Sequence, residues 1–372
     1  MNKILITGAK GFIGKNLVAE LNNRKAGEVL EFDKDNDPID LETFAKECDF
    51  VFHLAGVNRP EKPEEFTHGN FDLTVHLTNL LTKFKNKAPV ILSSSTQAAL
   101  DNDYGKSKKA AEDALFQYSK DSGVPVIAYR LPNVFGKWCR PSYNSVVATF
   151  CHNIAHDLPI QINNPESQMS QVYIDDVVTE FINKSGQMMN SNASELIEDI
   201  KPVYPVTLGN LAEKIRSFRG MRTNLEVPEM SDDFTKKLYA TYLSYLPEDG
   251  FSYPLKMNID NRGSFTEFIR TPDRGQISVN ISKPGIVKGN HWHHTKNEKF
   301  LVVKGKGMIR FRKIGTEKVI EYAVSGDKLE VVDIPTGYTH NIENLGETEM
   351  VTIMWASEAF DAEHPDTFFE VV

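Results

Sequence analysis

The sequence predicts an α/β domain with a doubly wound parallel sheet, followed by an all-β domain. Two observations predict this order. Short β-rich runs alternate with helical stretches over residues 1–130, and short strand-like runs separated by turn residues fill the chain beyond residue 255. Strands that alternate with helices are typical of a parallel sheet covered on both faces. Short strands at even spacing are typical of a sandwich or small barrel.

The first domain shows the alternation clearly. Helical segments are expected at residues 70–85 and 104–122, and the second of these ends before Gly123, a common helix stop. Residues 131–240 are less regular and indicate an α-rich appendage of the kind that often holds substrate. The expected strands are residues 3–7, 29–33, 50–54, 90–93 and 124–129.

The second domain begins after a stretch rich in aromatic residues, Pro and Gly at residues 242–255, which predicts a hinge. Helical periodicity disappears beyond it. The strand-like runs are QISVNIS, KFLVVKGKGMIRFR, KVIEYAV, KLEVVDIP and EMVTIMW. We therefore expect one domain over residues 1–245 and a second over residues 250–372.

Composition excludes several classes of protein. The chain has 372 residues, too many for one ordinary core. A net charge of -9 argues against nucleic acid as a partner, although a helix N-terminus can still hold a small phosphorylated molecule. The 3 cysteines form no CxxC pair, so we expect single thiols that are buried or have no role in the chemistry. No run approaches the roughly 20 apolar residues of a membrane span, so we expect a cytoplasmic protein without membrane contact.

Three glycines mark a candidate nucleotide site. Gly8, Gly11 and Gly14 follow the first expected strand and open a helix. Glycine permits the tight turn and close approach that a pyrophosphate requires, and the helix N-terminus stabilises its charge. A plain turn is the alternative. The GxxGxxG spacing resembles that of the extended branch of the short-chain dehydrogenase/reductase family, which implies a Rossmann-type domain that binds NAD(P).

Two further motifs agree with that resemblance. The string HLAG at residues 53–56 follows the third expected strand, and ILSSST at residues 91–96 ends the fourth. Tyr104 and Lys108 then form a YxxxK match on one helix face, where the lysine is expected to lower the tyrosine pKa. On its own such a match arises readily by chance, but its position after the serine cluster favours function.

The resemblance implies roles for these residues. Tyr104 would protonate the sugar alkoxide as hydride arrives, and Lys108 would hold the nicotinamide ribose. Ser95 would polarise the carbonyl, with Ser94 and Thr96 as alternatives. The implied cofactor residues are Gly8, Gly11, Phe12, Ile13, Gly14, Asp33, Lys34, Leu54, Ala55, Gly56, Tyr104 and Lys108.

The choice of dinucleotide stays open at this point. Asp33 ends the second expected strand, where an acid hydrogen-bonds a ribose 2′-hydroxyl and repels a 2′-phosphate. Lys34 and Lys10 offer charges that would offset the repulsion. We expect NADPH, with NADH as the alternative.

Two later segments resemble substrate-side segments of the same reductases. Arg130 and Asn133, within RLPNVFG, resemble a substrate-approach loop and are expected to bind substrate. Asp175 and Asp176 follow Tyr173 in a second such segment, where helix capping and a substrate role are both open.

The all-β domain carries a histidine pattern. His291 and His293 stand two residues apart, and Glu298 and His340 follow. Flanking glycines and a Pro335-x-Gly337 turn complete a resemblance to the two motifs of the cupin superfamily, which implies a cupin β-barrel. One departure is Leu329, where the family usually has glycine.

These four residues predict a divalent metal site. Histidines at i and i+2 point to the same face of a strand, and three imidazoles with one carboxylate suit Zn, Fe, Mn, Ni or Co. We favour zinc. One alternative is a set of hydrogen-bonding histidines, and another makes His291 a base, as in a sugar epimerase of the superfamily that lacks metal. His294 is a candidate for proton transfer, or an exposed histidine; a base shortlist adds Lys296 and Tyr338.

Arg262, in the segment DNRGSFTEF, resembles the opening of deoxysugar-epimerase cupins. It is expected either to contact phosphate or a partner, or to form a surface salt bridge.

The pairing of the two domains resembles the CapF/WbjC family of capsule and O-antigen enzymes over essentially the whole chain. The resemblance implies a homodimer acting on UDP-2-acetamido-2,6-dideoxy-4-hexulose. The cupin would epimerise C3 and the reductase would reduce C4 with NADPH. UDP-2-acetamido-2,6-dideoxy-L-talose would form, on the route to UDP-N-acetyl-L-fucosamine. A reductase with a structural metal cupin and a non-catalytic sugar sensor are the alternatives.

Overall fold

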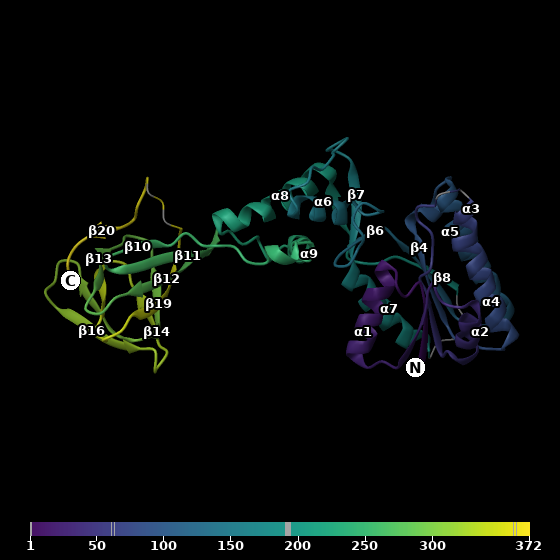
Figure 1. Cartoon of the computed structure of the whole chain (residues 1–372), viewed down its shortest axis with the longest axis horizontal. Helices are drawn as coiled ribbons and strands as arrows, with labels where there is room; N and C mark the ends of the chain where they lie inside the picture. The colour runs from purple at the N-terminus through teal and green to yellow at the C-terminus, as the bar shows by residue number, and fades with distance from the viewer. Residues whose placement is uncertain (1, 61, 63, 190–194, 360, 362) are drawn as a thin grey trace. The chain divides into compact units, whose positions relative to one another are not determined.

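The structure is a computed structural model that describes residues 2–60, 62, 64–189, 195–359, 361 and 363–372 (Figure 1). The chain divides into two compact units. Unit 1 comprises Met1–Arg216 and Asp233–Pro247, and unit 2 comprises Ser217–Asp232 and Glu248–Val372. The expected boundaries at residues 245 and 250 stay a prediction, and the structure adds that a short earlier segment groups with the second unit.

Unit 1 contains a six-stranded parallel sheet in the order β2-β1-β3-β4-β5-β8. The central strands β3 and β4 are buried along their whole length, which their runs of Val, Ile, Leu and Phe explain because both faces of the sheet are covered. The predicted Rossmann-type fold is confirmed. The strands are β1 (Lys3–Thr7), β2 (Glu28–Phe32), β3 (Phe50–His53), β4 (Val90–Ser95), β5 (Val126–Leu131) and β8 (Glu195–Glu198).

Helices cover both faces of this sheet (Figure 1). On one face, α1 (Phe12–Arg24) and α7 (Ile174–Met188) share a core with the rings of Phe50 and Phe52. On the other face, α2 (Pro38–Glu47), α4 (Leu73–Lys83) and α5 (Asp103–Ser122) share a second core around Leu77 and Leu115. Helix α5 begins at the Asn102 cap and ends at Gly123, the predicted stop, where φ is 71°.

The rest of unit 1 is a mixed α/β appendage, so the expectation of an α-rich segment over residues 131–240 was incomplete. A small sheet pairs β6 (Asn133–Phe135), β7 (Gln168–Tyr173) and β9 (Tyr204–Thr207). Helices α6 (Val146–Ala155), α8 (Leu208–Asn224) and α9 (Asp233–Leu243) accompany it, and α8 runs on into unit 2. Short helical turns lie at Glu64–Phe66, Thr67–Asp72, Thr96–Ala99 and Glu248–Gly250. Among the described residues, no helix has the length and hydrophobicity to cross a bilayer.

Unit 2 consists of two antiparallel sheets, as expected for the predicted β-barrel, which is confirmed. Their orders are β10-β11-β12-β19-β14-β17 and β16-β15-β18-β13-β20. The strands are β10 (Asn258–Asp260), β11 (Gly263–Thr271), β12 (Gly275–Ser282), β13 (Val287–Trp292), β14 (Glu298–Lys304), β15 (Lys306–Lys313), β16 (Val319–Ser325), β17 (Val331–Ile334), β18 (Tyr338–Asn344), β19 (Met350–Ala356) and β20 (Phe368–Phe369).

The interior of this barrel is apolar on one side and polar on the other. Buried aliphatic and aromatic side chains of β14, β15, β17 and β18 form the apolar core. Strand β12 instead buries its polar positions and leaves its three aliphatic ones half-buried on the outer face. The polar inward residues are Gln276, Ser278, Asn280 and Ser282. The barrel therefore has a polar inner wall, where Asn280 donates to the Ser282 hydroxyl and accepts from the Lys288 ammonium.

Candidate cofactor cleft and candidate metal centre

The glycine turn lies where β1 meets α1 and leaves no room for side chains. A Cβ atom on Gly8 would lie 2.7 Å from the backbone nitrogen of Ala55, and one on Gly14 would lie 2.2 Å from the carbonyl oxygen of Gly8. The φ of Gly8 is 71°, which glycine adopts without strain. Helix α1 has neither a side-chain cap nor an acidic residue in its first turn. Its N-terminal amides can therefore bind an anion, as a dinucleotide pyrophosphate requires.

The structure brings Asp33 to the same turn. Its carboxylate accepts hydrogen bonds from the backbone N–H groups of Lys10 and Lys34, both at 2.8 Å. The Lys10 ammonium pairs with Asp35, so its charge is already partly neutralised. Asp33 thus lies at the end of β2, where the sequence places an acceptor for a ribose hydroxyl.

The predicted catalytic residues converge beyond the ends of β3 and β4. Tyr104 forms a side-chain hydrogen bond with Ser95, and the Lys108 ammonium lies 6.0 Å from the centre of the tyrosine ring. That ammonium donates to the backbone oxygen of Ser93 at 3.2 Å. A Cβ atom on Gly56 would lie 2.9 Å from the Lys108 nitrogen, so the HLAG string borders the same site. Tyr104 and Lys108 of the YxxxK match therefore lie in one site with Ser95 and Gly56.

Burial controls the pKa values of this group. It lowers the pKa of Lys108 to about 8, against an opposing effect of the Glu112 carboxylate. It also raises the pKa of Tyr104, against the hydrogen bond with Ser95. The predicted lowering of the Tyr104 pKa is therefore wrong for this structure, because loss of hydration outweighs the stabilisation of the phenolate.

Glu112 is a buried residue that the sequence analysis missed. Its carboxylate accepts two hydrogen bonds from the Arg130 guanidinium, at 3.0 and 2.7 Å, and one from the hydroxyl of Ser94. It continues the four-residue spacing of Tyr104 and Lys108 along α5, which was the available signal. Ser94 is therefore turned away from Tyr104, and the Arg130 charge is neutralised within the protein.

The other substrate-side candidates form contacts within unit 1. The amide of Asn133 donates to the backbone oxygen of Ser170 at 3.3 Å, and its side chain is exposed. Asp175 pairs with Lys137 at 2.6 Å, and Asp176 pairs with Lys237 at 2.9 Å. The substrate roles of Arg130 and Asn133 stay predictions.

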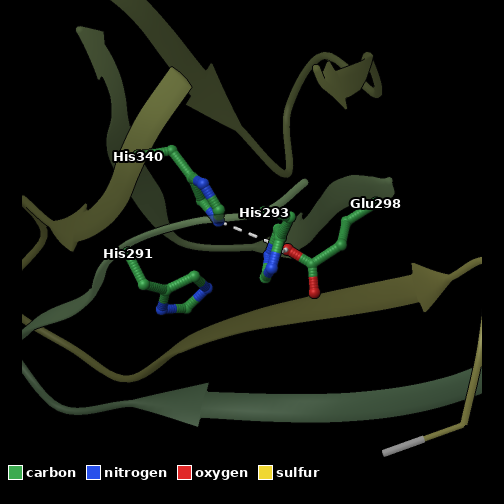
Figure 2. Close-up of side chains that lie close together, drawn as sticks. All are labelled: His291, His293, Glu298 and His340. Carbon is green, nitrogen blue, oxygen red and sulfur yellow. Dashed lines mark ion pairs between the residues drawn. The ribbon is translucent and has the colours of Figure 1, made fainter. Parts of the chain in front are cut away.

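The predicted metal ligands come together in unit 2 (Figure 2). His291 lies in β13, His293 follows that strand, Glu298 begins β14 and His340 lies in β18. One possible ligand atom from each residue lies within 4.8 Å of all the others. A Glu298 oxygen lies 3.4 Å from Nε2 of His293 and 3.2 Å from Nε2 of His340.

The chemistry of this cluster fits a divalent cation. Within the described chain, the buried side-chain atoms without a hydrogen-bond partner include Nε2 of His293, Oε2 of Glu298 and both ring nitrogens of His340. Each such atom costs about 1–3 kcal/mol when it is left unsatisfied. Burial lowers the pKa of His291 to about 4, which keeps that imidazole neutral with a free lone pair. Three imidazoles and one carboxylate match the ligands of zinc and related ions.

The proton-transfer candidates differ in position. The His294 ring is exposed and lies against Trp292 and Phe368, with ring centres 4.6 and 4.9 Å apart. Lys296 is buried, and its charge contributes to the lowered pKa of His291. Tyr338 is half-buried at the start of β18. Lys296 is thus the buried cation beside the cluster, while the predicted catalytic role of His294 stays a prediction.

A separate hollow in unit 2 contains none of the four clustered residues. Arg262, at its edge, forks onto Asp260 at 2.9 and 2.6 Å, and both side chains are exposed. This is the surface salt bridge that the sequence left open. The hollow is lined by Met257, Asn258, Ile259, Asp260, Arg262, Ser264, Phe265, Asn280 and Lys288.

This chain resembles known proteins both in its two separate domains and over its whole length. Residues 4–183 match the NAD dependent epimerase/dehydratase family, and residues 258–368 match the polysaccharide biosynthesis C-terminal domain. A UDP-2-acetamido-2,6-beta-L-arabino-hexul-4-ose reductase of Pseudomonas aeruginosa is 48% identical over 98% of each chain. The crystal structure of the capsular polysaccharide assembling protein CapF from Staphylococcus aureus is 51% identical over 100% of each chain, with a TM-score of 0.92.

A more distant structure supports the fold of unit 1 alone. The UDP-glucuronic acid 4-epimerase of Bacillus cereus, solved with UDP-glucuronic acid and NAD, is 18% identical with a TM-score of 0.54. The match covers 65% of this chain and 98% of that one. The epimerase/dehydratase family implies an NAD(P) cofactor for unit 1.

Gly14→Ala tests the glycine turn. The added methyl would meet backbone atoms of Gly8 and Ala9, so we expect it to displace the start of α1 and abolish NADPH binding, measured by cofactor fluorescence. Gly186→Ala is the matched control, because a Cβ atom there meets nothing within 4 Å. Unchanged NADPH affinity in Gly14→Ala would contradict the assignment.

Glu112→Gln tests the electrostatic setting of Lys108. If Lys108 acts as a cation, reduction slows as pH rises through its pKa of about 8. The Glu112 charge raises that pKa, so its removal should move the falling limb of kcat/KM to lower pH, by about 1 unit. The control is Asp113→Asn, since Asp113 is exposed and pairs with Lys109. An unshifted limb would exclude this role for Glu112.

Proposed function

This chain belongs to the family of CapF and the Pseudomonas UDP-sugar reductase, and we propose that it is a bifunctional UDP-sugar enzyme. Unit 2 epimerises C3 of UDP-2-acetamido-2,6-dideoxy-4-hexulose, and unit 1 reduces the C4 ketone with NADPH. The product is UDP-2-acetamido-2,6-dideoxy-L-talose, on the route to UDP-N-acetyl-L-fucosamine for capsule or O-antigen. The observation that carries the second activity is the buried cluster of His291, His293, Glu298 and His340.

The reduction uses the group around Tyr104. The nicotinamide supplies a hydride to C4 of the sugar when the cofactor is bound. The Tyr104 hydroxyl donates its proton to the C4 oxygen, and Ser95 lies beside it as a second hydrogen-bond donor. The Lys108 cation stabilises the phenolate that remains until solvent returns a proton.

The epimerisation needs a base near the metal cluster. The C3 proton is acidic because it lies next to the C4 carbonyl, and a divalent cation held by the cluster supplies positive charge for the oxygen that becomes negative. His294, Lys296 and Tyr338 are the candidate bases. Return of a proton to the opposite face inverts C3, and reduction at C4 then prevents reversal.

The polar side of the barrel supports a sugar as the ligand of unit 2. Ser278 of β12 pairs with Met354 of β19, which pairs with Phe300 of β14. Residues directly opposite one another in a sheet share a face, so the inward polar residues of β12 lie on the face that also carries Glu298. A sugar bound there would meet polar side chains, of which Asn280 already bonds Ser282 and Lys288.

A second candidate function keeps the reductase and makes the metal structural. The positions of the ligands favour a structural metal, because Glu298 belongs to one sheet whereas His291 and His340 belong to the other. A cation would therefore cross-link the two sheets. This alternative predicts a product reduced at C4 without inversion at C3.

Zinc is the proposed ion. A homodimer and a cytoplasmic location, both expected from the sequence, stay predictions.

Reaction in heavy water separates the two functions. With NADPH and the 4-keto UDP-sugar, we expect deuterium at C3 of the product, detected by mass spectrometry, because the removed proton exchanges with solvent. His340→Ala should abolish this label, since it removes one ligand. His364→Ala is the control, because His364 is an exposed histidine that contacts Asp361.

Reduced product without deuterium would leave a ketoreductase with a structural metal.

In the same assay Tyr104→Phe should stop NADPH oxidation while cofactor binding persists. Oxidation at the normal rate in that variant would contradict the assignment of the proton donor.

A further inference from the structure

Residues 366–371, the C-terminal segment, lie along the strand that carries a predicted ligand. Within this segment β20 pairs with β13, with His291 opposite Phe369 and Trp292 opposite Phe368. The N–H of Glu370 donates to the backbone oxygen of Asn290 at 2.9 Å. On its other side β13 pairs with β18, where His291 is opposite His340. Without β20, the strand bearing His291 would be an edge strand of its sheet.

The segment also sets the state of a second ligand. Nδ1 of His293 hydrogen-bonds to the backbone carbonyl of Asp366. A carbonyl oxygen can only accept, so Nδ1 must carry the proton of the neutral ring. The lone pair then resides on Nε2, the atom that lies 3.4 Å from Glu298 and has no hydrogen-bond partner. A ligand histidine oriented in this way is typical of metal sites.

The loop between His293 and Glu298 is held by the Asp366 side chain. Its carboxylate accepts hydrogen bonds from the backbone N–H groups of His294, Thr295 and Lys296 at 2.9, 2.7 and 2.8 Å. The Thr295 hydroxyl adds a fourth bond at 3.0 Å. One carboxylate therefore fixes the backbone that links two of the clustered residues.

Further contacts anchor the segment to the barrel. The Arg312 guanidinium donates to the Glu370 carboxylate at 2.8 Å and to the backbone oxygen of Val371 at 2.7 Å. The Phe368 ring lies 5.0 Å from the Trp292 ring, centre to centre. The Lys296 ammonium donates to the Thr367 hydroxyl at 2.9 Å. The segment is thus held by side chains of β15, of β13 and of the loop itself.

We propose that the C-terminal segment is a positioning element of the metal centre, in which the Asp366 carboxylate fixes the 294–297 loop between the ligands His293 and Glu298. The inference rests on the proposed binding of a cation by the cluster. Asp366 reaches the cation only through these groups, so it is a positioning residue.

Zinc affinity of the full chain tests this proposal. Asp366→Ala removes the acceptor of four hydrogen bonds, and we expect the zinc Kd to rise about 10- to 100-fold, as is usual when the groups that orient metal ligands are lost. The Kd is measured by competition with a chromophoric chelator. Asp366→Asn keeps one acceptor oxygen and should weaken binding less. Asp361→Ala is the matched control, because Asp361 is an exposed acid nearby whose bonds go to Glu363 and His364.

A spectrum separates positioning from simple loss of stability. Cobalt in place of zinc reports ligand geometry, so at saturating cobalt the visible bands of Asp366→Asn should shift from those of the unmodified chain. Thermal unfolding of the metal-free proteins identifies any variant that fails to fold. If Asp366→Ala does not fold, the zinc Kd and the cobalt spectrum of Asp366→Asn test the proposal. A Kd within twofold of the unmodified chain together with an unshifted spectrum would overturn the proposal. Failure of the unmodified chain to bind zinc would instead contradict the proposed function.

Discussion

Burial of lone pairs that point at one another is the constraint on which unit 2 depends. His293, Glu298 and His340 bring nitrogen and oxygen atoms without a hydrogen-bond partner into one cluster, where Glu298 lies within ion-pair distance of both imidazoles. Hydrophobic packing cannot compensate them, because each polar atom lost its water on folding. A cation would satisfy one atom of each residue at once and would link the two sheets. The same ion would place positive charge where the proposed sugar carbonyl becomes negative, so in the proposed function one cluster would serve both stability and chemistry.

Unit 1 uses burial differently. Burial raises the pKa of Tyr104 and lowers the pKa of Lys108, so it favours the neutral form of both side chains. The Glu112 carboxylate partly opposes this for Lys108, while its own charge is matched by Arg130. Glu112 thus acts on the pKa of Lys108, whereas the Tyr104 pKa depends on burial and on the hydrogen bond with Ser95.

Features with short sequence spacing were predictable, and those formed across long separations were not. The glycine turn, the YxxxK match and the HxH pair each lie within a few consecutive residues, so their spacing and their resemblance to known motifs revealed them. Asp366 lies 70 to 72 residues from the backbone N–H groups that it holds, and only the tertiary structure reveals those contacts. The polar inward face of β12 was hidden for a related reason. Its aliphatic residues alternate regularly, and the pattern does not say which face is the interior.

The metal content of the purified chain tests the central claim most directly. Elemental analysis by mass spectrometry should find one divalent metal ion per chain in the unmodified protein. The double variant His291→Ala, His340→Ala should lose it while unit 1 still binds NADPH. A metal-free unmodified chain, or a double variant that retains the ion, would contradict the assignment of His291, His293, Glu298 and His340 as a metal centre.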